Sequence, residues 1–271
     1  MHTEDHDFEE INNFNFNNSK IKWNNCHNDF SVTGKISTKS LKEVVDELKL
    51  SDKNYSSIIN LLKNFYLKNN NLAESTRKTL NYLFSDYGLI IIDPNSKILK
   101  KQIIHLIESD ILNNSSKNII NQTSDQLGYS QAFARDINFF YLHDNLRSRI
   151  IKDGNKYKVM NTEFIFSEQE IKKKINESPW SFSPNVLLRP LYQEVILPNI
   201  AVVGGQNEIL YWLQLKQLFK THLISYPILF VRNSAFILNT RFNNYLDNLK
   251  SVSYTHLRAH ETGRNRGWRG V

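Results

Sequence analysis

Apolar positions follow two different periods in the first third of the chain. From Phe8 to Lys22, apolar and polar residues alternate around the polar triplet at 17–19, which predicts a β-hairpin. Apolar residues at helical spacing then predict three helices, over 41–50, 55–67 and 72–85.

An uninterrupted apolar run, Leu89–Ile92, marks a change of pattern. It has no polar face and predicts a buried strand that Asp93-Pro94 ends. Asp93 has two interpretations. It is a functional carboxylate at the carboxyl end of a strand, where open α/β sheets place such groups, or it only caps the helix expected over 96–112. Residues 113–126 are polar around a helical core at Ile119-Ile120.

Short strands and a strong turn signal occupy the middle of the chain. Residues 139–142 predict a strand, and Asp153-Gly154-Asn155 predicts a hairpin between 147–152 and 156–160. Ser167 with Glu170 three positions later has the pattern of a capping box, so a helix is expected over 167–175.

The stretch 183–216 contains several residues that favour the start or the end of a helix. Ser183-Pro184 predicts the start of a helical turn, and Pro190 the start of a second short helix that ends at Pro198. Ile200–Val203 predicts a strand covered on both sides.

A glycine turn and an amphipathic helix complete this stretch. Gly204-Gly205 predicts a sharp turn, followed from about Glu208 by a helix with an apolar stripe. The stripe comprises Ile209, Trp212, Leu213 and Phe219. A strand followed by a glycine turn and a helix N-terminus offers free N–H groups to an anion. The full G-x-G-x-x-G fingerprint is absent, so a plain chain reversal is the simpler interpretation. A further buried strand is expected over 227–231 and a helix over 236–249.

The composition fits a globular α/β chain. Of 271 residues, 40% are hydrophobic and 12% aromatic, which excludes a disordered chain. No apolar run reaches membrane-spanning length. The single cysteine, Cys26, excludes an internal disulfide and favours a cytoplasmic protein.

The net charge of +7 is unevenly distributed. Residues 252–271 hold four Arg and one Glu, a net charge of +3, which leaves +4 over the other 251 residues. Neither nucleic acid nor membrane is therefore expected as a partner. The last twenty residues contain no Lys, and Ser253–Thr262 resembles translated sequencing-adapter DNA. We therefore expect residues 251–271 to be a foreign, disordered tail.

The chain begins with a cluster of titratable groups: Glu4, Asp5, His6 and Asp7. Carboxylates beside an imidazole raise its pKa and orient its ring, which suits acid/base chemistry or cation binding. A frayed acidic terminus is the other interpretation.

Several long strings resemble the bacillithiol biosynthesis cysteine-adding enzymes. The matching strings are TEDHDFEEIN (3–12), INFFYLHDNLRSRI (137–150), SPNVLLRPLYQEVILPNIAVVGG (183–205), EILYWLQLK (208–216) and RNSAFIL (232–238). The chain departs from the family at Gln206-Asn207-Glu208, where Pro-Gly-Glu is usual, which puts the ligand geometry of that loop in doubt.

The resemblance implies an α/β fold with a Rossmann-like core, similar to nucleotidyltransferases and class I synthetases. It implies an incomplete core in an internal fragment, with helical and β-hairpin connective insertions. The implied parts are the end of a first Rossmann half with a hairpin (1–40), a helical insertion (41–85), and a second half (86–250) with an inserted hairpin at about 137–165. A coiled-coil arm, which this chain lacks, implies a homodimer of the full-length protein.

The implied activity is a ligase that joins the carboxyl of cysteine to the amine of glucosaminyl-malate. ATP or another nucleotide is then expected as the cofactor, a role for a metal is left open, and the fragment alone is expected to be inactive. The alternatives are an aminoacyl-activating or nucleotidyl-transferring enzyme acting on another substrate, and a non-catalytic ligand-binding fragment.

The resemblance also assigns candidate site residues. His6 is the expected acid/base or phosphate-contacting group, with Asp7 and Glu4 orienting it. Arg189 and Arg232 suit phosphate or malyl carboxylates, because a guanidinium binds such groups through two bonds. The further candidates for substrate or nucleotide binding are Asp93, Asn185, Gln193, Gly204, Gly205, Glu208, Trp212, Lys216 and Asn233, and no metal ligand is assigned.

Glu208 changes the ligand expected at the glycine turn. A carboxylate in the first helical turn suits the helix dipole but repels phosphate, so a ribose hydroxyl or the ammonium of cysteine fits better. Glu208, Trp212 and Lys216 are spaced by four residues on one helical line. The alternative is a surface ion-pair ladder with Trp212 in the core.

Overall fold

The structure, a computed structural model, describes residues 4–5, 7–16, 19–24, 31–48 and 56–235. The chain divides into two compact units, residues 1–231 and 232–271. Residues 232–235, the described part of the second unit, are exposed. The helix expected over 236–249 and the expected foreign tail lie outside the described residues.

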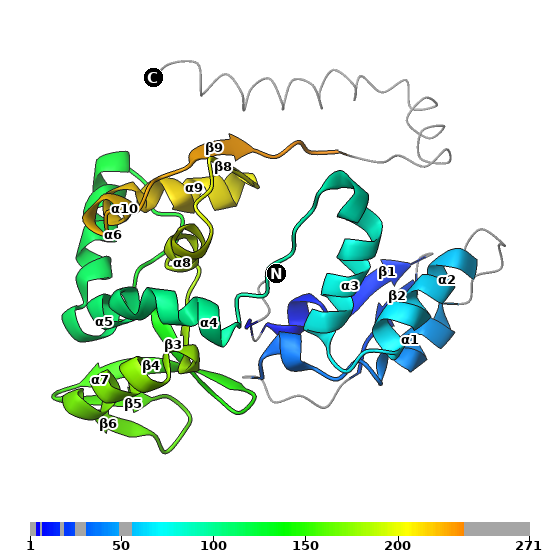
Figure 1. Cartoon of the computed structure of the whole chain (residues 1–271), viewed down its shortest axis with the longest axis horizontal. Helices are drawn as coiled ribbons and strands as arrows, with labels where there is room; N and C mark the ends of the chain where they lie inside the picture. The colour runs from blue at the N-terminus through cyan, green and yellow to red at the C-terminus, as the bar shows by residue number, and fades with distance from the viewer. Residues whose placement is uncertain (1–3, 6, 17–18, 25–30, 49–55, 236–271) are drawn as a thin grey trace. The chain divides into compact units, whose positions relative to one another are not determined.

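The first unit begins with the predicted hairpin and helices. Strands β1 (Asn13–Phe16) and β2 (Ser19–Lys22) pair antiparallel, with Phe14 opposite Ile21. Helices α1 (Leu41–Glu47), α2 (Ser56–Leu62) and α3 (Leu72–Phe84) follow (Figure 1). The hairpin and the three helices are confirmed.

Two local features define the ends of these helices. A π-helical turn, Lys63–Leu67, continues α2. The Asn71 side chain accepts a hydrogen bond from the Glu74 N–H at 2.9 Å, so it caps α3 and satisfies one of the free N–H groups at that end.

The strand predicted at Leu89–Ile92 is wrong. This segment is extended, but it belongs to none of the sheets that the described residues form. Ile90 is 82% exposed. An apolar run becomes a strand only where another strand satisfies its backbone groups, and the described residues supply none here.

A helical region then packs against the core. The predicted helix over 96–112 is present but divided into α4 (Lys97–Lys100), a 3-10 turn (Lys101–Ile103) and α5 (Ile104–Asn113). Helix α6 (Ser115–Leu127) follows, as its pattern predicts.

A five-stranded antiparallel sheet lies at the centre of the unit, in the order β6-β5-β4-β3-β7. The predicted strand at 139–142 and the hairpin around Gly154 are confirmed, and so is the capping box at the start of α7. The elements are β3 (Phe139–His143), β4 (Leu146–Asp153), β5 (Lys156–Val159), β6 (Ile165–Ser167), α7 (Glu168–Glu177) and β7 (Phe182–Pro184).

The helical start predicted at Ser183-Pro184 is wrong, because these residues form the end of β7. Ser183 pairs with Phe140 and Pro184 with Phe139. Since β7 is the edge strand, Pro184 fits there without breaking the ladder. Helix α8 (Arg189–Ile196) does begin at the predicted place.

A β-α-β unit ends the described part of this unit. Strands β8 (Ala201–Gly204) and β9 (Ile228–Val231) pair in parallel, and helices α9 (Gln206–Gln214) and α10 (Lys216–Thr221) connect them. Both strands lie where the sequence predicts them. Their predicted burial is wrong, because Val203 is 67% exposed and Phe230 53%. An apolar run indicates a strand, whereas only neighbouring elements bury it.

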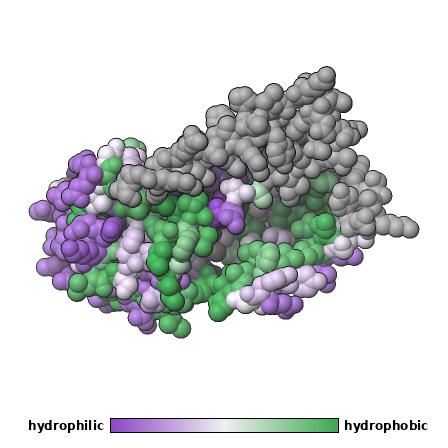
Figure 2. All heavy atoms as spheres, turned by 90° about the horizontal axis from the view of Figure 1, so that it is seen from above, coloured by the Kyte–Doolittle hydropathy of each residue, from purple (hydrophilic) through white to green (hydrophobic). Residues whose placement is uncertain are grey.

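The main core lies between the antiparallel sheet and helices α5 to α10. A second, smaller core forms around the hairpin from Ile21, Trp23, Ile36 and Val44. Apolar side chains also reach the surface shown in Figure 2. No helix among the described residues is long and apolar enough to cross a membrane. The main core comprises Ile103, Leu106, Ile107, Ile111, Ile120, Phe139, Tyr141, Tyr157, Phe182, Leu191, Trp212 and Phe219, with further residues packed around them.

Candidate functional site

Asp5 lies between two guanidinium groups. Arg189 donates to it through two hydrogen bonds, Nη1 to Oδ2 at 3.1 Å and Nη2 to Oδ1 at 2.6 Å. Arg147 Nη1 is 3.6 Å from Oδ1 of the same carboxylate. The Thr33 N–H donates to the Asp5 carbonyl at 2.6 Å, which holds the backbone there. The start of the chain is therefore tied to α8 and β4, and the frayed-terminus interpretation fails at Asp5.

Arg147 joins this ion pair to the central sheet. Its Nε donates to Ser183 Oγ at 3.1 Å and its Nη2 to the Pro184 carbonyl at 3.0 Å. The guanidinium lies over the Phe140 ring, 3.7 Å from the centroid. Burial, and then the nearby charge of Arg189, lower the pKa of Arg147 to about 10. A group with this pKa remains a cation at neutral pH.

Glu4 and Lys100 form a fully buried ion pair beside this cluster. Lys100 Nζ also donates to the Phe182 carbonyl at 2.8 Å. Burial lowers the pKa of Lys100, and the Glu4 carboxylate opposes that shift. With its side chain 0% exposed and paired, Glu4 holds the chain start against α4.

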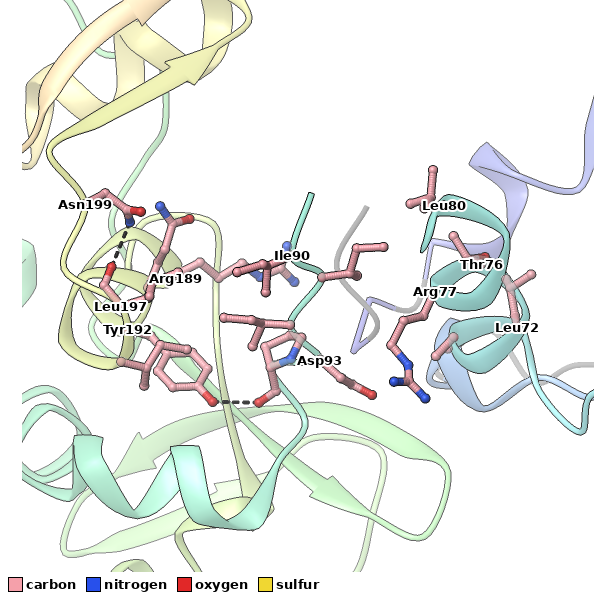
Figure 3. Close-up of a pocket in the computed structure, with 17 residues that line it drawn as sticks. Leu72, Thr76, Arg77, Leu80, Ile90, Asp93, Arg189, Tyr192, Leu197 and Asn199 are labelled. Carbon is pink, nitrogen blue, oxygen red and sulfur yellow. Dashed lines mark hydrogen bonds between the residues drawn. The ribbon is translucent and has the colours of Figure 1, made fainter. Parts of the chain in front are cut away.

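A cavity of about 470 Å³ opens between α3, the extended segment 88–94 and α8 (Figure 3). Arg77 points from α3 into this space, and the Asp93 carboxylate faces the same space. The Tyr192 hydroxyl donates to the Pro94 carbonyl at 2.6 Å and fixes the segment to α8. We call this cavity the α3–α8 pocket. It is lined by Gly34, Leu72, Ala73, Thr76, Arg77, Leu80, Ile90, Ile91, Ile92, Asp93, Pro94, Arg189, Tyr192, Gln193, Ile196, Leu197 and Asn199.

Asp93 does not take the capping role, and its role as a functional carboxylate stays a prediction. It follows an extended segment and not a strand, and its Oδ1 accepts from the Asn95 N–H at 2.9 Å. Ser96 is the N-cap of α4, without a side-chain bond. Asp93 closes a local turn at the edge of the pocket.

Asn185 and Gln193 make contacts within the protein. Asn185 Oδ1 accepts from the Leu187 and Leu188 N–H groups at 2.9 and 3.1 Å, while its Nδ2 donates to Asn138. These bonds shape the chain that enters α8. Gln193 lines the α3–α8 pocket, and its Nε2 donates to Glu194 at 3.0 Å.

The glycine turn is closed by its own helix. Glu208 Oε2 accepts from the Gly205 N–H at 2.6 Å, so one of the free donors at the start of α9 is used. Gly204 is crowded, because a Cβ there would lie 3.2 Å from the Cβ of Glu208. Gly205 has φ −65° and ψ 164°, which other residues adopt readily.

The expected helical line through Glu208, Trp212 and Lys216 is wrong. Helix α9 ends at Gln214, and Lys216 begins α10. Trp212 is 4% exposed and packs against Phe219, with ring centroids 5.8 Å apart. This burial supports the interpretation that Trp212 is a core residue.

Asp7 is not among the residues that line the α3–α8 pocket. His6 lies outside the described residues. Asp7 precedes a short 3-10 turn (Phe8–Glu10) and is exposed. Arg232 and Asn233 follow β9 directly and are exposed, in the second unit. Within the described residues, no group of three or more His, Cys, Asp or Glu side chains is arranged to hold a metal ion.

Three cations at or near the site are absent from the sequence prediction: Lys100, Arg147 and Arg77. Arg147 lies in the string INFFYLHDNLRSRI, yet its strand period alone gives no reason to choose it. Lys100 and Arg77 lie in helices that the sequence predicts over 96–112 and 72–85, and that prediction singles out neither residue. Their roles depend on contacts between segments far apart in the chain, for which a local pattern has no signal.

A β-α-β unit with parallel strands, combined with helices and an antiparallel sheet, makes this a mixed α/β domain. The chain belongs to the family described as "Bacillithiol biosynthesis BshC, N-terminal Rossmann-like domain", whose sequence model matches residues 1–233.

Curated relatives support the same assignment. A protein of Flavobacterium psychrophilum is 48% identical over 247 residues, which cover 89% of this chain and 46% of the relative. Proteins of Flavobacterium johnsoniae and Christiangramia forsetii are 42% and 40% identical, over 92% and 96% of this chain and 48% and 50% of theirs. All three carry the name "Putative cysteine ligase BshC". The chain spans about half the length of these relatives.

Proposed function

We propose that this chain is part of a cytoplasmic ligase that joins the carboxyl of cysteine to the amine of glucosaminyl-malate in bacillithiol biosynthesis. The observation that carries the proposal is the family match over residues 1–233, together with the name shared by relatives up to 48% identical. The reaction forms a C–N bond at the carboxyl carbon of cysteine, and one carboxyl oxygen leaves. A free carboxylate does not react with an amine at neutral pH, so a nucleotide would activate it, and the carboxyl oxygen would leave on a phosphate group of that nucleotide while the amine loses a proton.

The charge cluster gives the strings that define the family a structural role. Asp5 belongs to the string TEDHDFEEIN, and Arg189 to SPNVLLRPLYQEVILPNIAVVGG. Their two-bond ion pair holds these distant strings together. In this proposal the pair fixes the chain at Asp5, which precedes His6 in the sequence, and His6 acts as the acid/base group. Asp5 and Arg189 are then positioning residues, because each neutralises the charge of the other.

The pairing of Arg189 with Asp5 changes its proposed role. When both Nη groups of a guanidinium donate to a carboxylate, the face that binds an anion through two hydrogen bonds is already occupied. The malyl carboxylates of glucosaminyl-malate are therefore assigned to another cation, and Arg232 is the candidate that the sequence supplies.

The test compares this chain with the full-length Flavobacterium psychrophilum relative. Each protein is incubated with cysteine, glucosaminyl-malate and ATP, and the amide product is measured by mass spectrometry. We expect product from the relative, with nucleotide consumed in proportion to it. We expect no product from this chain, which spans about half of that relative.

Matched controls make the result specific. Omitting ATP, or replacing cysteine by serine, is expected to abolish product in the relative. Nucleotide turnover without amide formation would contradict the proposal and favour an enzyme that activates or transfers to another substrate. Absence of both turnover and product in the relative would also overturn it.

A further inference from the structure

The α3–α8 pocket has the size and lining of a site for a nucleotide-sized molecule. Its volume of about 470 Å³ lies within the range of about 300–1,000 Å³ that ligand sites occupy. Leu72 and Leu80 on α3 and Ile90 on the opposite wall supply apolar surface (Figure 3). A free amino acid such as cysteine has too little apolar surface to use these walls. A flat nucleobase has a large apolar face and fits them.

Arg77 supplies a cation for an anionic group. It lies on the pocket wall and is exposed, and the ion pair of Glu74 on the same helix is made with Lys78. Arg189, the other guanidinium of the lining, is bound to Asp5. Arg77 is therefore the lining cation that remains able to bind phosphate through two hydrogen bonds.

The Asp93 carboxylate is a hydrogen-bond acceptor that faces the same cavity. A carboxylate repels phosphate, but it accepts hydrogen bonds from ribose hydroxyls, as acidic residues do in dinucleotide sites. Figure 3 shows Arg77 and Asp93 facing one space from opposite walls. The arrangement places a phosphate-binding group and a hydroxyl-binding group beside apolar walls.

We propose that the α3–α8 pocket binds a nucleoside phosphate, with the base between Leu80 and Ile90, the ribose at Asp93 and the phosphate at Arg77. The inference rests on the proposed function only in that a ligase that activates a carboxylate needs a nucleotide. This site is separate from the glycine turn at 204–205, where Glu208 already occupies the Gly205 N–H.

The test is direct binding to this chain, without cysteine or sugar. AMP and adenosine are titrated by calorimetry against the wild-type chain and two variants of neighbouring cations. Arg77→Ala is expected to weaken AMP binding 10- to 100-fold and adenosine binding less than threefold, because only AMP carries the phosphate. Lys78→Ala is the matched control, since Lys78 is on the same helix but pairs with Glu74 outside this pocket. It is expected to change AMP binding less than threefold.

Asp93→Asn tests the ribose contact. It is expected to weaken AMP and adenosine by the same factor, 3- to 30-fold, with the melting temperature of each variant measured first to confirm folding. No binding of AMP to the folded wild-type chain at millimolar concentration would overturn the proposal. Equal effects of Arg77→Ala and Lys78→Ala would also overturn it.

The binding assay separates this proposal from the ligase assignment. If the full-length relative makes the amide while Arg77→Ala leaves AMP binding unchanged, the site is wrong and the ligase stands. If AMP binds with the expected Arg77 dependence and no amide forms, the site stands and the ligase is wrong.

Discussion

Asp5 and Arg189 are 184 residues apart in sequence and share two hydrogen bonds, of 3.1 and 2.6 Å. The pair joins the acidic start of the chain to the first residue of α8. Arg147 lies on the other side of the same carboxylate, so removing Asp5 leaves two guanidinium groups close together. Asp5 therefore determines whether this part of the site can assemble.

Replacing Asp5 by Asn is expected to lower the free energy of unfolding by about 1–3 kcal/mol, because charge-assisted bonds are lost and the two guanidinium groups repel each other. A double-mutant cycle with Arg189→Gln, measured by urea denaturation, should give a coupling energy of about 1–2 kcal/mol, reduced from the fully buried case because both side chains are about one-fifth exposed.

The control cycle uses the exposed pair Lys117–Asp136, whose atoms are 2.7 Å apart. Its coupling energy should stay below about 1 kcal/mol, since solvent screens exposed charges. Equal coupling in the two cycles would contradict a special role for Asp5.

The Glu4–Lys100 pair is fully buried, and its disruption should cost more. Lys100→Met is expected to lower the free energy of unfolding by about 3–5 kcal/mol, because it leaves the Glu4 carboxylate buried without its cation. Adding Glu4→Leu to that variant should recover most of the loss, since removing both charges removes the desolvation cost. A double variant less stable than Lys100→Met would show that the charges themselves stabilise the fold. Thermal denaturation measures all three proteins.

Asp110 predicts a pH dependence of stability. Its carboxylate is buried and accepts from the Asn138 N–H at 2.5 Å and the Asn138 amide at 3.1 Å. Burial raises the pKa of Asp110 to about 6. The folded state thus binds this proton more tightly than the unfolded state, whose pKa is about 3.9. The contribution of Asp110 is most favourable below pH 4, is lost as pH rises to 6, and is constant above that.

Asp110→Asn should remove that slope. Between pH 4 and 6, the wild-type chain should lose up to about 3 kcal/mol of unfolding free energy relative to this variant. Because other carboxylates titrate in both proteins, the difference between the two curves is the quantity to measure. Parallel curves would show that the Asp110 pKa is not raised.

The two glycines of the turn should respond differently to substitution. Gly204→Ala places a Cβ 3.2 Å from Glu208 Cβ and Ile209 Cδ1, so we expect a loss of about 1–2 kcal/mol. Gly205→Ser should change stability by less than about 0.5 kcal/mol, because Gly205 is the N-cap of α9 and serine is favoured there. Urea denaturation of both variants measures this contrast, and equal losses would contradict it.

The local elements were largely readable from the sequence, because their causes are local. The capping box of Ser167 and Glu170, the turn at Gly154, the hairpin of β1 and β2 and the start of α8 at Arg189-Pro190 depend on residues within a few positions of one another. Their backbone groups are satisfied within the same segment, so a pattern of a few residues is sufficient.

The site was decided by tertiary structure, because its contacts join segments that the sequence keeps far apart. Asp5 meets Arg189 and Glu4 meets Lys100 only once the chain start lies against α4 and α8. For the same reason, the apolar runs at 89–92 and 200–203 predict the extended backbone correctly and the burial wrongly. Whether a segment is buried depends on the elements that pack over it. Its hydrophobicity determines only how much free energy is gained when they do pack over it.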